Sequence, residues 1–262
     1  MNLNLANKNA LVCGGSQGLG AAVAKELALL GASVIVLARN ETNLKKIVAG
    51  LDKSLEQQHS YIVADTSKPV ELLEKVNQFL SAGNIIHILV NNSGGPAAGP
   101  LLDTAAAELE TAFQSHLIIS HLLAQAIVPG MKTAGYGRII NIVSTSVKQP
   151  INGLGISNTI RAAVANWAKT LANEIGSYGI TVNNVLPGYT NTDRLDYLFS
   201  KQADNASISK EEILQRTLAL IPTGRLGEPE EFGAAVAFLC SPAAGYINGI
   251  NLPVDGGRLG GL

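Results

Sequence analysis

The sequence predicts an α/β fold in which one parallel sheet of about seven strands carries helices on both faces. Short apolar runs alternate with longer helical patterns along the whole chain, as in repeated βαβ units. The short runs are almost continuously apolar, which is typical of strands that are covered on both faces. A glycine-rich loop, Gly14 to Gly20, separates the first strand from the first helix. Together these observations predict a single doubly wound, Rossmann-type domain over residues 1–262.

Each strand is predicted from an apolar run, and each helix from the longer periodic pattern that follows it. The strands are expected, in order, at Ala10–Cys13, Ser33–Leu37, Tyr61–Val63, Ile86–Asn91, Gly137–Val143, Ile180–Leu186 and Ile250–Val254. The helices are expected at Leu19–Leu30, Thr42–Leu55, Pro69–Leu80, Ala105–Pro129, Ser157–Tyr178 and Pro229–Cys240. No repeat, linker or low-complexity tract interrupts this alternation.

One polar stretch, Asp193 to Ser209, has no regular pattern and is long for a connection within a compact domain. It is interpreted either as a mobile lid over a site or as a surface insertion. A lid is expected to occupy residues 193–220. The stretch contains no motif from which a substrate could be read.

The composition fits one globular domain and disfavours several classes of partner. With 262 residues, of which 47% are hydrophobic, the chain can bury a large core. A formal net charge of -1 gives no electrostatic case for binding nucleic acid or an anionic membrane surface. The sequence has neither a signal-peptide pattern nor an apolar run of spanning length, so a cytoplasmic protein is expected. Cys13 and Cys240 lie far apart in apolar surroundings and are expected to be buried free thiols.

The glycine loop predicts a dinucleotide site. Glycines permit a tight turn and let the backbone approach a pyrophosphate closely. The N-terminus of the following helix supplies unpaired N–H groups and the positive end of the helix dipole. The candidate contacts in this loop are Gly14, Ser16, Gln17, Gly18, Leu19 and Gly20.

Further motifs follow the glycine loop in order along the chain. They are Asn91-Asn92-Ser93-Gly94, the turn Pro187-Gly188, the segment Gly224–Glu231 and the segment Val254–Gly257. On these motifs the chain resembles the short-chain dehydrogenase/reductase family, and most of all its 3-oxoacyl-acyl-carrier-protein reductase branch. The resemblance covers essentially the whole chain. It implies an oxidoreductase that acts on CH–OH and C=O groups with a nicotinamide cofactor.

The resemblance also implies three further groups of cofactor contacts. One residue, Asp65, corresponds to the family's contact to the adenine amino group. A second group, Asn92, Ser93 and Gly94, braces the sheet and lines the cofactor. In the third group, the turn Pro187-Gly188 and the hydroxyl of Thr192 hold the nicotinamide carboxamide.

The end of the second predicted strand favours NADP over NAD. A site that selects NAD usually places a carboxylate there to bind the ribose 2′-hydroxyl. Ala38 lacks that carboxylate, and Arg39 offers a planar cation suited to a 2′-phosphate. The alternative is that Arg39 is a solvated loop charge. Gln17 is neutral where NADP-preferring members of the family often carry a second basic residue, so NAD remains the alternative cofactor.

The catalytic positions depart from the family's pattern. The resemblance implies an Asn, a Ser, a Tyr and a Lys, of which the Ser is retained as Ser144. Ser157 and Arg161 stand at the Tyr and Lys positions and keep their i, i+4 relation on one helix face. His116 stands at the Asn position. Because a serine hydroxyl is far less acidic than a phenol, and Arg releases no proton in the working range, a different proton donor is expected.

Each of these positions has a plain structural alternative. Ser157 and Arg161 could be helix-surface residues, His116 a hydrogen-bonded structural histidine, and Ser144 a cap for nearby backbone. If the protein is catalytic, the proton is expected to come through His116, Tyr189 or an ordered water. Arg161 would disfavour an imidazolium at His116. Tyr189 is interpreted as packing against the lid rather than reaching the nicotinamide pocket.

Two functions therefore stand side by side. The first is an NADP-dependent oxidoreductase in which Ser144 holds a carbonyl oxygen and Arg161 stabilises the alkoxide or clamps an anionic group. The second is a catalytically silent NADP-binding homologue that acts as a sensor or partner subunit. The related enoyl reductases fit poorly, because their Tyr and Lys lie further apart and no such pair occurs around Lys169. The resemblance implies a small carbonyl or acyl substrate and a homotetramer or homodimer. No metal is expected.

Overall fold

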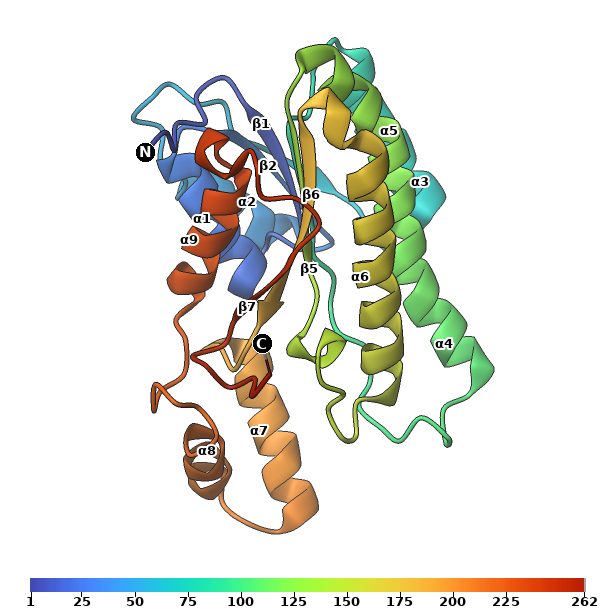
Figure 1. Cartoon of the computed structure of the whole chain (residues 1–262), viewed down its shortest axis with the longest axis vertical. Helices are drawn as coiled ribbons and strands as arrows, with labels where there is room; N and C mark the ends of the chain where they lie inside the picture. The colour runs from blue at the N-terminus through green and yellow to red at the C-terminus, as the bar shows by residue number, and fades with distance from the viewer. Residues whose placement is uncertain (262) are drawn as a thin grey trace.

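The computed structural model describes residues 1–261 and confirms the parallel α/β sheet. All its strand pairs are parallel, in the order β3-β2-β1-β4-β5-β6-β7. The order reverses between β1 and β4, so the two halves of the chain build opposite sides of the sheet (Figure 1). The strands are β1 (Asn9–Cys13), β2 (Ser33–Ala38), β3 (Ser60–Val63), β4 (Ile88–Asn91), β5 (Gly137–Ile142), β6 (Ile180–Pro187) and β7 (Asn251–Val254).

Helices cover both faces of this sheet. They are α1 (Gly18–Leu29), α2 (Glu41–Ala49), α3 (Pro69–Ser81), α4 (Ala106–Phe113), α5 (Ile119–Ala134), α6 (Gly155–Ile175), α7 (Asp193–Ala206), α8 (Lys210–Leu218) and α9 (Pro229–Cys240). In Figure 1, α1, α2 and α9 pack on one face and α3, α5 and α6 on the other. The pair α7 and α8 lies beyond the carboxyl ends of the strands, at the bottom of the view.

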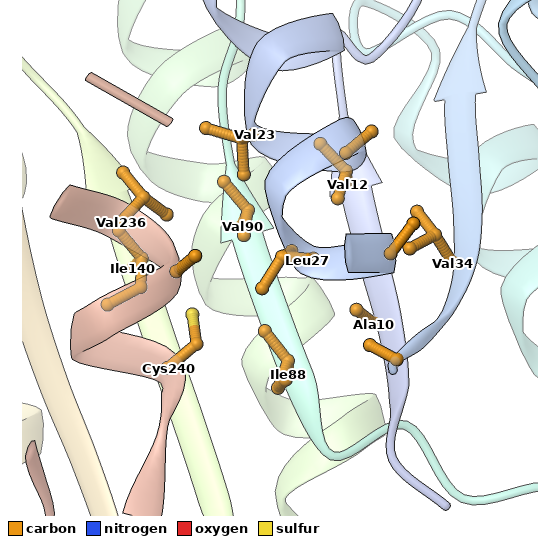
Figure 2. Packing of buried hydrophobic residues seen from close by; sticks show 14 of the residues in the cluster. Ala10, Val12, Val23, Leu27, Val34, Ile88, Val90, Ile140, Val236 and Cys240 are labelled. Atoms are coloured by element: carbon orange, nitrogen blue, oxygen red, sulfur yellow. The ribbon is translucent and has the colours of Figure 1, made fainter. Parts of the chain in front are cut away.

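Two buried apolar clusters, one on each face, hold the helices to the sheet. Figure 2 shows the first cluster, in which Val23 and Leu27 of α1 and Val236 of α9 pack over the central strands. In the second cluster, Leu123 and Ile127 of α5 pack on the opposite face. Because the strands are covered on both sides, their residues are buried almost without interruption, which explains the continuous apolar runs of the sequence.

Both cysteines are buried free thiols, as predicted. Cys13 ends β1 and Cys240 ends α9, so the two belong to different elements. Burial raises the pKa of each thiol to about 12, and neither is a thiolate at neutral pH.

The predicted elements are present, with shifts at their ends. The helix predicted at Thr42–Leu55 ends at Ala49, where Gly50 follows. The single helix predicted at Ala105–Pro129 is divided into α4, a π-helical turn η1 (Gln114–Ile118) and α5, which continues past the predicted end to Ala134. A π-helical turn widens the helix locally and often marks a functional position.

The prediction that Asp193–Ser209 has no regular structure was wrong, because these residues form α7 and the loop before α8. Thr192 and Ser209 cap the two helices by accepting hydrogen bonds from the N–H groups three residues ahead. The stretch appeared irregular because only a narrow stripe of each helix is apolar, and the exposed faces carry charges. The apolar stripes of α7 and α8 pack against each other in a small cluster that is separate from the main core. The buried members of this cluster are Leu195, Phe199, Ala203 and Ile213.

The continuous helical run Ala106–Ala134 is long and apolar enough to cross a membrane by length and composition alone. One such helix is weak evidence for a membrane span. Its residues Leu123, Ile127 and Met131 are buried against the sheet. This burial is the arrangement of a helix that contributes to a protein core.

Candidate active site

A cleft of about 740 Å³ opens at the carboxyl edge of the sheet. Because all strands are parallel, the loops that follow them meet at this edge, beside the reversal of strand order. Of the predicted cofactor residues, all except Gly20 and Gly188 line the cleft directly. The predicted residues that line it are Gly14, Ser16, Gln17, Gly18, Leu19, Arg39, Asp65, Asn92, Ser93, Gly94, Pro187, Thr192 and the predicted catalytic residue Arg161.

The glycine loop makes a tight cradle at the start of α1. Gly14 and Gly18 have φ values of 60° and 53°, in the left-handed region that favours glycine. A Cβ atom on Gly20 would lie 2.2 Å from the carbonyl oxygen of Gly14, so this position also requires glycine. Asn92 Nδ2 donates to the same carbonyl oxygen at 3.2 Å and ties the loop to the end of β4. The first turn of α1 carries no acidic side chain, so its N–H groups favour an anion.

Two charged residues flank this cradle. Arg39 follows β2 and lines the cleft without a carboxylate in ion-pair contact within residues 1–261. Asp65 Oδ1 accepts a hydrogen bond from the N–H of Ser67 at 2.9 Å. That bond, with a smaller contribution from the charge of Arg39, lowers the pKa of Asp65. The cleft therefore presents an unpaired cation and an ionised acceptor in the positions predicted for a 2′-phosphate and an adenine amino group.

The turn after β6 closes the other end of the cleft. Pro187 and Thr192 line it, whereas Gly188 packs behind it. A Cβ atom on Gly188 would lie 2.5 Å from the Cα atom of Asp255, and its N–H donates to the carbonyl of Val254 at 2.9 Å. Gly188 thus holds the turn against the segment that follows β7 and permits the close approach that places its neighbours.

Arg161 is the most unusual charged residue of the site. It lies on α6, is 9% exposed, and lines the cleft. Its Nη1 donates to the carbonyl oxygen of Ile142 at 2.7 Å, and the guanidinium has no other protein acceptor within the described chain. Burial lowers the pKa of Arg161 to about 10, so it remains cationic at neutral pH. A buried cation with spare donors facing a cleft is suited to stabilising negative charge on a bound molecule.

The two serines of the predicted catalytic set have different surroundings. Ser144 follows β5, and its Oγ accepts a hydrogen bond from the N–H of Ser146 at 3.1 Å. Ser144 is not itself among the residues that line the cleft in the described chain, whereas its chain neighbours Ile142 and Val143 are. Ser157 is half-buried, one turn before Arg161 on α6, and is not among the residues that line the cleft in the described chain. The catalytic roles of both serines stay predictions.

His116 is held in the π-helical turn η1 and is 4% exposed. Its Nδ1 lies 2.5 Å from the Oγ of Ser93, a pairing that the sequence analysis did not identify. Burial, and secondarily the charge of Arg161, lowers the pKa of His116 to about 3. His116 is therefore neutral at physiological pH. It can hydrogen-bond, but it has no imidazolium proton to give.

Tyr189 packs against α7, as interpreted from the sequence. Its ring centroid lies 6.2 Å from that of Phe199, and the guanidinium of Arg258 lies 4.9 Å above the ring. Arg194, at the start of α7, lines the cleft and was missed. The available signal was its position two residues after Thr192, which the sequence analysis had placed at the cofactor.

Sequence comparisons agree with this geometry. A family model described as enoyl-(acyl carrier protein) reductase matches residues 14–258. A 3-oxoacyl-[acyl-carrier-protein] reductase from Vibrio cholerae is 34% identical over 257 residues, covering 97% of this chain and 98% of that protein. A chloroplastic tropinone reductase homologue from Arabidopsis thaliana is 32% identical over 256 residues, covering 97% of this chain and 76% of that protein.

Solved structures extend the similarity to three dimensions. L-sorbose reductase from Gluconobacter frateurii, complexed with NADPH and L-sorbose, has a TM-score of 0.93 and 28% identity, with both chains covered completely. A 7α-hydroxysteroid dehydrogenase complexed with NADH has a TM-score of 0.88 and 30% identity, covering 100% of this chain and 98% of that one. With a family model over nearly its whole length and full-length relatives above 30% identity, the chain belongs to the short-chain dehydrogenase/reductase family.

Proposed function

We propose that this protein binds NADP(H) and reduces a carbonyl group to an alcohol, using a proton donor other than tyrosine. The observation that carries the proposal is Arg161. It is a buried guanidinium with one protein acceptor, and it lines the same cleft as the glycine loop. Arg161 stands at the position that the resemblance implies for the family's Lys, so a cation would lie where an alkoxide develops.

The residues of the cleft fit a nicotinamide dinucleotide. Gly14 and Gly20 lie so close to neighbouring residues that a Cβ on either would collide with them. Glycines in such a loop also let a pyrophosphate approach the backbone closely. Arg39 supports NADP as the preferred cofactor, since a guanidinium can bind a 2′-phosphate through two hydrogen bonds. The similar L-sorbose reductase is complexed with NADPH, whereas the similar 7α-hydroxysteroid dehydrogenase is complexed with NADH, so NAD is the weaker alternative.

The bound cofactor would supply a hydride to the carbonyl carbon. The Oγ of Ser144 is the group proposed to donate a hydrogen bond to the carbonyl oxygen, while it still accepts the bond from the N–H of Ser146. The guanidinium of Arg161 would stabilise the negative charge that appears on that oxygen. Arg161 is fixed by its bond to Ile142, so it needs little reorganisation when the charge develops.

A 3-oxoacyl thioester is the substrate class we favour. Support comes from the full-length similarity to a 3-oxoacyl-[acyl-carrier-protein] reductase. The similar tropinone and L-sorbose reductases are named for other carbonyl substrates, so a panel should include cyclic ketones and ketoses as well. Arg161 and Arg194, both at the cleft, would also suit a substrate that carries an anionic group.

A specific observation favours a second function. Ser157 is not among the cleft residues of the described chain, and His116 is neutral, so neither replaces the phenol as an acid. A protein with these features could bind NADP(H) tightly without turnover and act as a sensor or as the partner of an active subunit. Activity that appears or changes on mixing with another family member would support this alternative.

The decisive experiment measures NADPH oxidation over the carbonyl panel, with NADPH binding measured in parallel. We expect turnover in the wild type, and a loss of about 100-fold or more in both Ser144→Ala and Arg161→Ala. Binding without turnover on any carbonyl would favour the silent homologue. Absence of binding would remove both functions.

The setting we propose is a cytoplasmic homotetramer or homodimer. The full-length similarity to a 3-oxoacyl-[acyl-carrier-protein] reductase supports a small-molecule substrate. The outer surfaces of α4, α5 and α6 carry partly exposed apolar residues, such as Phe113, that could pack against another copy. Light scattering at several protein concentrations would determine the assembly.

A further inference from the structure

Four asparagines form a continuous ladder across the sheet. They stand side by side in register on four neighbouring strands: Asn91, Asn141, Asn184 and Asn251. Each amide nitrogen donates to the amide oxygen of the next strand, at 2.9 Å, 3.0 Å and 2.8 Å in turn. Such a chain of aligned amides polarises its members and concentrates acceptor character at its first oxygen.

The direction of the ladder is fixed by a backbone contact. The nitrogen Nδ2 of Asn184 also donates to the carbonyl oxygen of Ala165 at 3.5 Å, so this side of the amide must be the donor. Its oxygen must then accept from Asn141, and the oxygen of Asn141 from Asn91. The ladder therefore leaves Asn91 Oδ1 as its free end. This oxygen is buried and has no protein hydrogen-bond partner within residues 1–261.

Asn91, which carries this free oxygen, lines a small cavity beside the cleft. The cavity has a volume of about 20 Å³, and its polar lining includes Asn91, Ser93, His116 and Arg161. A site needs about 10–15 Å³ and two to four polar partners to hold one water molecule. Ser93 and Arg161 also line the large cleft, so the cavity adjoins the place where substrate would react.

The chemistry of the lining selects the occupant. Asn91 Oδ1 can only accept a hydrogen bond, and the spare groups of Arg161 can only donate. A molecule between them must donate to one and accept from the other. An anion would bind Arg161 but be repelled by the amide oxygen, and a metal cation would be repelled by the guanidinium. Water meets both requirements and fits the volume.

We propose that this cavity binds one ordered water molecule between Asn91 Oδ1 and the guanidinium of Arg161, and that this water protonates the reduced substrate. This inference rests on the proposed carbonyl reduction. As the carbonyl carbon takes up hydride, its oxygen gains an electron pair and then a proton from the water. The O–H bond of the water breaks as that of the alcohol forms. The hydroxide left beside Arg161 takes a proton from solvent entering the cleft.

A crystal structure at high resolution, with and without NADP⁺, tests the site without relying on activity. We expect one water within hydrogen-bond distance of both Asn91 Oδ1 and Arg161 in each. A dry cavity would overturn the proposal. So would a structure in which a cofactor hydroxyl or a reoriented His116 occupies the free oxygen of Asn91.

Filling the cavity tests the role of the water in the reaction. Val164 lines the cavity and carries no reacting group, and Val164→Ile adds one methyl group to the space that the water would occupy. We expect about a 100-fold loss of carbonyl reduction with NADPH affinity unchanged within two-fold. The matched control, Val164→Ala, enlarges the cavity and should retain activity within a few-fold.

The outcomes distinguish a failure of the proposed water from a failure of the proposed carbonyl reduction. Unchanged turnover in Val164→Ile, with its crystal structure lacking the water, would overturn the role in proton transfer. A wild type that does not oxidise NADPH would overturn the proposed function, while an ordered water in its structure would still establish the site. Thermal unfolding of both variants checks that the cavity substitutions leave the fold intact.

Discussion

The nucleotide half of the cleft and its reacting half are held in different ways. In the nucleotide half, the loop after β1 acts mainly through backbone, and Gly14 and Gly20 leave no room there for a side chain. In the reacting half, around Arg161 and His116, side chains are held by single partners, the carbonyl of Ile142 and the hydroxyl of Ser93. A backbone site tolerates few residue types, whereas a side-chain site can be rebuilt when its partners change with it.

The largest effect is expected from a methyl group in the nucleotide half. Gly20→Ala would place a Cβ atom 2.2 Å from the carbonyl oxygen of Gly14, so the loop must change shape. We expect NADPH binding to weaken by about 100-fold or more, equivalent to about 3 kcal/mol. Fluorescence titration with NADPH measures this loss. The control is Gly99→Ala, because a Cβ there meets no atom within 4 Å; equal effects in both variants would contradict the importance of the cradle.

A smaller loss of NADPH affinity is expected when the charge of Arg39, at the edge of the nucleotide half, is removed. Arg39→Ala removes a guanidinium that has no carboxylate partner in the described structure. We expect NADPH affinity to fall by roughly 10- to 100-fold, the value of one or two hydrogen bonds between charged groups. Affinity for NADH, which lacks the 2′-phosphate, should stay the same and serves as the internal control. Equal losses for both cofactors would mean that Arg39 supports the loop rather than selecting NADP.

In the reacting half, the buried histidine should make the stability of the fold depend on pH. The folded pKa of His116 is lowered to about 3 from 6.5, so between these values the unfolded chain binds a proton that the folded one does not. Stability attributable to His116 is therefore complete above pH 6.5 and lost as pH falls toward 3, by up to about 1.4 kcal/mol per pH unit. Urea unfolding between pH 7 and pH 4.5 should show a shallower loss for His116→Asn than for wild type. His121→Asn, at an exposed histidine, should leave the wild-type loss unchanged.

The smallest effect is expected at the position of the family's tyrosine. Ser157 is half-buried on α6 and is not among the residues that line the cleft within the described chain. Ser157→Ala should change kcat/KM by less than about two-fold, because substitutions away from special contacts have small effects. Steady-state kinetics with NADPH and the best carbonyl of the panel would measure it. A loss as large as that of Ser144→Ala would restore Ser157 to the catalytic set.

The same difference explains what sequence reasoning could reach. Parallel strands, the glycine loop and Arg39 were predictable because period, positive φ and charge each require particular residue types. The helix α7 was missed, because its apolar stripe is narrow and its exposed face is charged. The capping residues Thr192 and Ser209 were the signals that could have identified these helices.

The contacts of the reacting half could not be predicted from the sequence, for a physical reason. The bond between Ser93 and His116 joins residues from different elements, and no local pattern encodes it. The asparagine ladder likewise depends on strand register, which places Asn91 beside Asn141 and Asn184 beside Asn251. Register follows from the packed sheet as a whole, and in the sequence each asparagine is only an isolated polar residue in or beside an apolar run.

Transfer of deuterium from the cofactor tests the central claim most directly, namely that hydride transfer persists without the tyrosine and lysine. NADPH deuterated at the transferring position is mixed with the protein and a carbonyl substrate, and the alcohol is analysed by mass spectrometry. We predict deuterium in the alcohol formed by the wild type, and about 100-fold less labelled alcohol or lower in the same time with Arg161→Ala. Tight NADPH binding with no deuterium in any product, across the whole carbonyl panel, would contradict the account.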